Sequence, residues 1–179
     1  MITNIFYSTL FFLIFLNSTI SGAMDFCSNI NKYAKNKDET TKYIDDIKKF
    51  AQPILSDKDC STIKKYEETN WALIDSRDKA SRKSTGSFKG TVKILSDHHD
   101  ASNHKFDEAN LKKKLGKYFG NTSMSLDEIK GKNLILFCNG LKCFRSSWAA
   151  CSLKELGFKK DNIFVVLDGY TGIKNNCIK

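Results

Sequence analysis

Proline and cysteine are scarce in this sequence of 179 residues. The single proline excludes proline-rich linkers. Six cysteines are too few, at this length, for a fold that depends on a disulfide scaffold. Apolar residues make up 41% of the chain and charged residues 27%, which is a globular and not a disordered composition. The length therefore predicts one domain with its own core and a small extension.

Acidic side chains are outnumbered, 20 against 29 basic ones, which leaves a net charge of +9. This excess favours anionic partners. Aromatic and basic residues do not interleave, however, so we expect no nucleic-acid binding. The scattered lysines of 30–70 and 111–117 are typical of solvated helix faces.

The first 23 residues contain no charged side chain. Their apolar run, Phe11 to Leu16, is too short to span a bilayer as a finished anchor, and small residues, Ser21-Gly22-Ala23, follow it. We interpret 1–23 as a signal peptide that is cleaved after Ala23; a retained anchor helix is the alternative. The interpretation predicts a periplasmic or secreted protein with no stable membrane anchor after cleavage.

All six cysteines follow this segment, so export would place them in an oxidising compartment. The sequence does not determine how they pair, and at least one could be reactive. Cys27, Cys60 and Cys177 flank the fold, and two of them could form a structural disulfide. Cys151 lies in the middle of a predicted helix, where we expect a core residue.

Hydrophobic periodicity predicts strands alternating with helices, which indicates an α/β fold: a central parallel sheet flanked by helices. The predicted strands are 71–75, 91–95, 133–137 and 163–167. The predicted helices are 40–51, one that opens at Ser56 with Asp59 as in a capping box, 111–119, 125–129 and 146–156, the last capped by Gly157. Residues 24–52 would then be a helical N-terminal extension of a domain at 53–179.

Two segments are expected to be loops: 76–90, and 96–105, which holds all three histidines. The second loop has no helical pair of histidines and no nearby cysteine. We therefore expect no metal site in this protein.

The most informative segment is Phe137-Cys138-Asn139-Gly140-Leu141-Lys142-Cys143-Phe144-Arg145. Cys138 follows a buried strand, and a compact loop leads to the start of a helix. Ligands of open parallel sheets bind at this place. Curled backbone N–H groups, the helix dipole and the charges of Lys142 and Arg145 would all favour a thiolate. We therefore expect a nucleophilic Cys138 with a lowered pKa.

The segment resembles the active loop of the rhodanese family of sulfurtransferases. Further similarities occur in register: Trp71 to Asp78 with its Asp-x-Arg signature, Ser87 to Ile94, Ser146 to Phe158, and Val166 to Gly172. The resemblance covers about residues 53–175. It implies a rhodanese-like three-layer domain with a central parallel sheet, and it requires no cofactor.

The resemblance also implies a mechanism in which Cys138 attacks the outer sulfur of a small anionic donor such as thiosulfate. The resulting persulfide would pass its sulfur to a thiol or to cyanide. Arg145 would bind the donor's anionic group, and Asn139, Gly140, Leu141, Lys142 and Phe144 would complete the binding loop. Asp75 and Arg77 are expected to hold the strand end by hydrogen bonds.

The loop differs from the usual rhodanese pattern, because Arg145 lies seven residues beyond Cys138 and the loop is two residues longer. It also contains Cys143, as in a subset of the family with a Cys-Asn-Gly-x-x-Cys loop. Cys143 could resolve a Cys138 intermediate as a disulfide or act as a second nucleophile. A thiol–disulfide redox protein and a non-catalytic module that binds an anion or a protein are therefore the alternative functions.

Overall fold

The computed structural model describes residues 27, 30, 40–94 and 108–178. The predicted signal peptide and the histidine loop lie outside the described residues. Within them, five strands form one parallel sheet in the order β1-β5-β4-β2-β3. The strands are β1 (Gln52–Ile54), β2 (Trp71–Asp75), β3 (Val92–Lys93), β4 (Asn133–Phe137) and β5 (Ile163–Val166). The predicted α/β class with a parallel sheet is confirmed.

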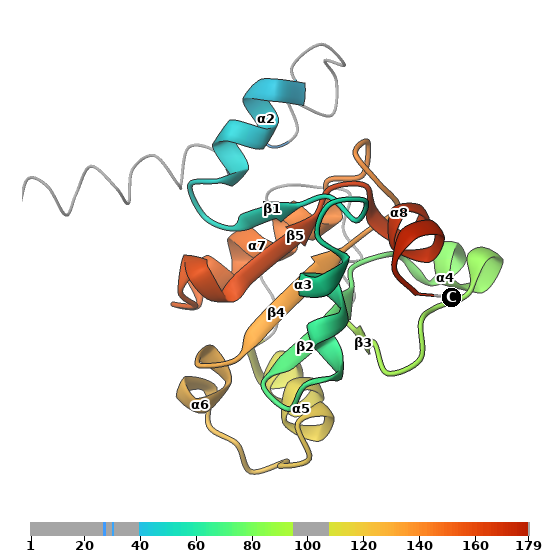
Figure 1. The fold of residues 1–179 in the computed structure, drawn as a ribbon. Helices are drawn as coiled ribbons and strands as arrows, with labels where there is room; N and C mark the ends of the chain where they lie inside the picture. The colour runs from blue at the N-terminus through green and yellow to red at the C-terminus, as the bar shows by residue number, and fades with distance from the viewer. Residues whose placement is uncertain (1–26, 28–29, 31–39, 95–107, 179) are drawn as a thin grey trace, which may run out of the picture.

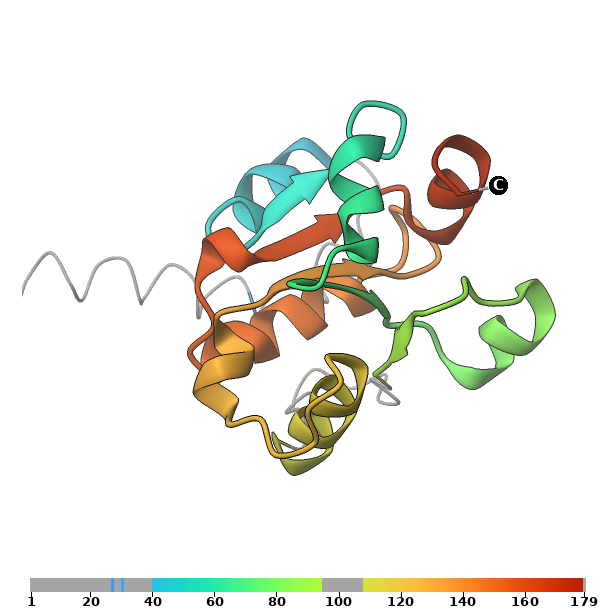
Figure 2. The same cartoon turned by 60° about the horizontal axis from the view of Figure 1, so that its bottom comes forward.

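Helices cover both faces of the sheet, as Figures 1 and 2 show. The α-helices are α2 (Thr40–Ile47), α3 (Cys60–Lys64), α4 (Lys79–Thr85), α5 (Glu108–Tyr118), α6 (Leu126–Lys130), α7 (Arg145–Glu155) and α8 (Gly169–Asn176). Two 3-10 turns, η2 (Lys65–Glu67) and η4 (Lys160–Asn162), precede β2 and β5. Helices α3 and α8 lie on one face, and α5, α6 and α7 lie on the other (Figure 2).

The alternation of side chains along the strands explains the two layers of core. In β4, Leu134 and Leu136 join the larger core cluster, on the side of α5, α6 and α7. Ile135 and Phe137 point the other way and join the cluster on the side of α3 and α8. All four side chains are fully buried, which is typical of a central strand in a covered parallel sheet. Since Cys138 follows this strand, its backbone position is determined by a buried strand that is paired on both sides.

Several local predictions are wrong. Gln52–Ile54 forms the edge strand β1, and the predicted loop 76–90 contains α4. The helix expected at Ser56 begins only at Cys60, because the Ser56 side chain binds Asp168 and does not cap that helix. Helix α8 was not expected at all, since glycine and asparagine are weak helix formers. In each of these segments, tertiary contacts determine the secondary structure.

The structure pairs four of the six cysteines, as Cys27–Cys151 and Cys60–Cys177. The expected pairing among the flanking cysteines is therefore found for Cys60 and Cys177. The expectation that Cys151 is a simple core residue is wrong in part, because this buried side chain is bonded to Cys27. Cys138 and Cys143 remain free.

Candidate active site

The loop that carries both free cysteines joins β4 to α7 at the carboxyl end of the sheet. Its backbone turns at Gly140, which has a φ of +147°, and the N–H of Cys143 donates to the carbonyl of Gly140 at 2.8 Å. Helix α7 begins at Arg145 without a side-chain cap. The N–H groups of its first turn are thus left to the loop and to whatever binds there.

The Cys138 side chain is 1% exposed. Its S–H group donates to the carbonyl oxygen of Cys143 and lies 3.7 Å from that of Gly140. The Ser146 hydroxyl donates to the sulfur at 3.4 Å. A sulfur that donates to a carbonyl must carry its proton, so this geometry holds Cys138 as a neutral thiol.

The expected low pKa of Cys138 is therefore wrong for this conformation. Burial raises the pKa of the Cys138 thiol well above its usual range, and its hydrogen bond to Cys143 acts in the same direction. The backbone of Gly140 and the Ser146 hydroxyl oppose this rise but do not outweigh it.

Cys143 is the cysteine at the focus of the loop's donors. Interaction with the Cys138 side chain lowers its pKa to about 6, against the opposing effect of burial. The backbone of Asn139, the backbone of Arg145 and the Arg145 charge lower that pKa further. Cys143 thus carries the negative charge beside a neutral Cys138 thiol, and the charge lies on the less buried of the two cysteines.

The first residues of helix α8 contact the backbone of the loop. The N–H of Tyr170 donates to the carbonyl of Cys138 at 2.7 Å. A Cβ atom at Gly169 would lie 2.4 Å from both the Cys138 carbonyl oxygen and the Gly140 nitrogen, so the loop packs directly on the glycine backbone. Gly169 also has a φ of +62°, a conformation that glycine adopts without strain.

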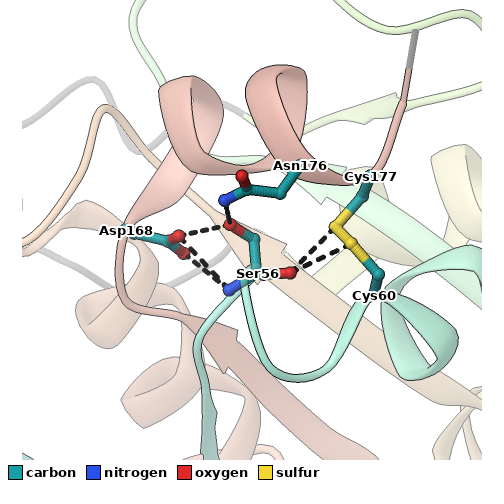
Figure 3. The surroundings of a disulfide bond; sticks show 5 residues. All are labelled: Ser56, Cys60, Asp168, Asn176 and Cys177. Atoms are coloured by element: carbon teal, nitrogen blue, oxygen red, sulfur yellow. Dashed lines mark hydrogen bonds between the residues drawn. A yellow bond between two sulfur atoms is a disulfide. The ribbon is translucent and has the colours of Figure 1, made fainter.

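The C-terminal end of α8 is fastened to the chain before α3 (Figure 3). The disulfide Cys60–Cys177 lies beside the carbonyl oxygen of Ser56, which contacts the two sulfurs at 3.0 and 3.3 Å. The Ser56 hydroxyl binds the carboxylate of Asp168 and accepts a hydrogen bond from Asn176 at 2.9 Å. Asp168 immediately precedes Gly169, so this network holds the helix that supports the loop.

Helix α4 contacts the loop from another side. Arg145 forms an ion pair with Asp78 at 2.7 Å, and the Asn139 amide donates to the Ser81 hydroxyl at 3.3 Å. The pKa of Asp78 is lowered mainly by the Ser81 backbone N–H, which its side chain caps, and also by Arg145. Arg145 therefore lies at the end of the loop, as expected for a residue that binds an anion there, but its guanidinium is paired with the Asp78 carboxylate.

The remaining predicted binding residues lie along the rim of the loop. Leu141 is 44% exposed, Lys142 and Asn139 are exposed, and Phe144 is half-buried beneath Tyr43. Asp75 and Arg77 have the structural role expected: both are fully buried, and the guanidinium donates to both carboxylate oxygens at 2.9 and 2.7 Å. This ion pair stacks on the Tyr170 ring, 3.9 Å from its centroid.

Sequence reasoning missed three residues near the loop. Tyr43 comes from α2, and its hydroxyl meets that of Ser147 at 2.5 Å. Ser146 binds the Cys138 sulfur. Ser76 follows β2 at the position that pairs with Cys138 if the register of β2 and β4 continues by one residue, and its buried hydroxyl has no hydrogen-bond partner among the described residues. Of these, only Ser146 carried a signal in the sequence, since it follows the loop directly.

The described ranges contain no group of histidine, cysteine, aspartate and glutamate side chains suited to a metal ion. Nor is any helix in them long and apolar enough to cross a membrane.

In a comparison with known families, the sequence model of the rhodanese-like domain matches residues 61–176. The matched segment includes β2 to β5, the loop with both free cysteines and all of α8. Helix α2 and β1 precede it. No curated protein sequence matches the chain.

Proposed function

The chain belongs to the rhodanese-like domain family, and from this premise we propose that it is a sulfurtransferase that carries sulfane sulfur as a persulfide on Cys138. The observation that carries the proposal is the pair of free cysteines in the loop between β4 and α7, in which the Cys138 S–H group donates to the carbonyl oxygen of Cys143. Cys138 occupies the carrier position of the family, and Cys143 is the base that activates it.

Activation requires a proton to move from Cys138 to Cys143. The shift is uphill in the resting loop, because the pKa of Cys138 is raised and that of Cys143 is lowered, so the attack on the donor must draw the small population of Cys138 thiolate forward. Cys143 holds the negative charge at rest, and it takes the proton of Cys138 as the S–H group turns away from the Cys143 carbonyl. An adjacent base is a general way to activate a nucleophile. The Ser146 hydroxyl, which already donates to the Cys138 sulfur, would stabilise the new thiolate.

The transfer then proceeds in two steps. The Cys138 thiolate attacks the outer sulfur of thiosulfate, the bond between the two donor sulfurs breaks, and sulfite leaves with the electron pair. A thiolate or cyanide acceptor next attacks the outer sulfur of the Cys138 persulfide and restores the Cys138 thiolate, which regains its proton from Cys143. Each step conserves charge, and neither needs an outside oxidant or reductant.

The surroundings favour an anionic donor. Arg145 and the uncapped start of α7 lie at the loop, and Lys142 is exposed on it. These groups would stabilise the developing negative charge of the leaving sulfite. We further propose that the protein acts in the periplasm or outside the cell, after removal of 1–23; the two disulfides Cys27–Cys151 and Cys60–Cys177 support an oxidising compartment.

Peptide mass spectrometry after incubation with thiosulfate tests the proposal. The wild-type peptide should gain about 32 Da, one sulfur atom, on Cys138. Cys138→Ser should form no persulfide. Cys143→Ser should still form one, but only at a pH nearer the ordinary range of a thiol, because it lacks the base. A persulfide found on Cys143 in the Cys138→Ser variant would refute this assignment.

The same sulfur pair favours a second function, that of a thiol–disulfide redox protein. In that case the Cys143 thiolate attacks an external disulfide, and Cys138 resolves the mixed disulfide, leaving a Cys138–Cys143 bond. Incubation with a disulfide would then give a loss of about 2 Da on the loop peptide and no retained sulfur. If the Cys138→Ser/Cys143→Ser variant keeps the protein's biological function, that function needs neither sulfur. This outcome would exclude both sulfur transfer and thiol–disulfide exchange, and it would support a binding module.

A further inference from the structure

We propose that α2 forms part of the active site, and that Tyr43 is a positioning residue for the loop that carries Cys138 and Cys143. The helix precedes the matched segment 61–176, so family membership alone does not account for it. The proposal concerns how the loop is held and rests on the proposed function only for its catalytic consequence.

Tyr43 reaches the loop across a long stretch of chain. Its hydroxyl and that of Ser147 are 2.5 Å apart, although the residues are 104 positions apart in the sequence. The edge of its ring packs on Phe144 with the ring centroids 5.0 Å apart. The side chain is 5% exposed. Tyr43 thus contacts the last loop residue and the first turn of α7 at the same time.

Tyr43 and Cys27, which both precede the matched domain, contact the same face of α7. Phe144, Ser147 and Cys151 are spaced by three and four residues, so they share one face of the helix. Tyr43 contacts the first two, and Cys27 is bonded to the third. This disulfide fastens the segment before α2 to the same face, one turn beyond the Tyr43 contact. The fold therefore holds Tyr43 against α7 from outside the matched domain.

The contact lies close to the reacting sulfurs. Ser147 follows Ser146, whose hydroxyl donates to the Cys138 sulfur. Burial raises the pKa of the Tyr43 phenol, the bond with Ser147 opposes this, and electrostatic interaction with the two loop cysteines raises it further. Tyr43 thus stays an uncharged phenol within electrostatic reach of both sulfurs.

Positioning by Tyr43 would act on the thiolate through α7. The N–H groups of the first turn of α7 stabilise the charge on Cys143 only while that turn keeps its orientation. The hydroxyl contact at Ser147 and the ring contact at Phe144 restrict this orientation. Loss of the hydroxyl should therefore weaken the thiolate while leaving the sulfurs themselves unchanged.

The test measures alkylation of Cys143 by iodoacetamide against pH, in the full chain with both disulfides intact. Tyr43→Phe keeps the ring but removes the hydroxyl, and it should shift the profile to higher pH. At pH 5, below the pKa of Cys143, the rate should fall about three- to tenfold, the effect of one hydrogen bond. Ser147→Ala removes the other end of the same bond and should give the same shift, with no further change in the double variant.

Tyr118→Phe is the matched control, because the Tyr118 hydroxyl donates to the Tyr66 carbonyl at 3.0 Å, away from the loop. It should leave the profile unchanged. If the profiles of Tyr43→Phe and Ser147→Ala superimpose on that of the wild type, the positioning role is refuted. If they shift while the wild type transfers no sulfur from thiosulfate, the positioning role stands and the sulfurtransferase proposal fails.

Discussion

At the scale of single residues, burial decides where the negative charge of the loop lies. Cys138 is buried, and its S–H group donates to a carbonyl oxygen. Cys143 is less buried, and its sulfur accepts hydrogen bonds from the backbone. The charge of Arg145 adds to the preference for a thiolate at Cys143. A family pattern specifies the residue types, but it does not determine how they share one proton.

This difference predicts the pH dependence of labelling. Because the pKa of Cys143 is lowered to about 6, its alkylation rate should rise through that pH and level off by about pH 7.5. An ordinary thiol would still be rising through about pH 8.5. Alkylation with mass mapping at several pH values measures this, with the unfolded chain in urea as the control. A Cys143 profile equal to that of the unfolded chain would contradict the prediction.

Gly169 is the second residue whose substitution is informative. In Gly169→Ala the new Cβ would collide with the backbone of Cys138 and Gly140, in addition to the strain of a positive φ. Gly120→Ala is the matched control, since Gly120 has a φ of +76° and open space around it.

We expect Gly120→Ala to lose about 1–2 kcal/mol of unfolding free energy through strain alone. Gly169→Ala should lose about 1–3 kcal/mol more through the collision. Urea unfolding of both variants measures the difference. Equal losses would show that the loop does not pack on Gly169 as described.

At the scale of elements, α4 occupies the position where the sequence suggested open loop. Its N-cap Asp78 holds Arg145, and its Ser81 contacts Asn139. The short helix thereby limits the freedom of the loop and of the Arg145 guanidinium. Under the proposed function, a donor anion would compete with Asp78 for Arg145.

Asp78→Asn tests this competition. Asparagine is an equally good N-cap, so α4 should persist while the carboxylate charge is lost. If the proposed transfer is correct, the freed Arg145 should lower KM for thiosulfate about two- to fivefold, the scale of a partly exposed ion pair. Steady-state kinetics measures this, and Asp127→Asn, which breaks the exposed pair with Lys130, is the control. An unchanged or higher KM would show that Arg145 does not bind the donor.

At the scale of the whole molecule, two disulfides each join residues that are far apart in the sequence. Cys27–Cys151 spans 124 positions and Cys60–Cys177 spans 117. The first ties the N-terminal segment to α7 and the second ties α8 to α3. Both bonds therefore hold elements that contact the loop with the two free cysteines, from opposite faces of the sheet.

Because the two closed loops are of nearly equal length, removing either disulfide should cost a similar free energy of unfolding, about 2–5 kcal/mol. The variants are Cys27→Ala/Cys151→Ala and Cys60→Ala/Cys177→Ala, measured by urea unfolding. Cys143→Ala, which removes a free cysteine, should cost less than about 1 kcal/mol. Wild-type stability in either double variant would show that its disulfide does not form in the folded protein.

The sequence by itself determined the features that depend on neighbouring residues. Runs of buried residues such as Leu134 to Phe137 identified the central strands, and the loop from Cys138 to Arg145 was recognisable by its place between a strand and a helix. The helix cap at Gly157, with its φ of +89°, was equally local.

Only the tertiary structure decided the remainder. The short strand β1 exists because β5 offers it backbone partners, and Cys151 is bonded because α7 presents it to Cys27. The ionisation of Cys143 depends on the burial of Cys138, and the part played by Tyr43 depends on a contact across 104 positions. Burial, pairing and electrostatic coupling are properties of distances in space, and a periodic pattern along the chain carries no information about them.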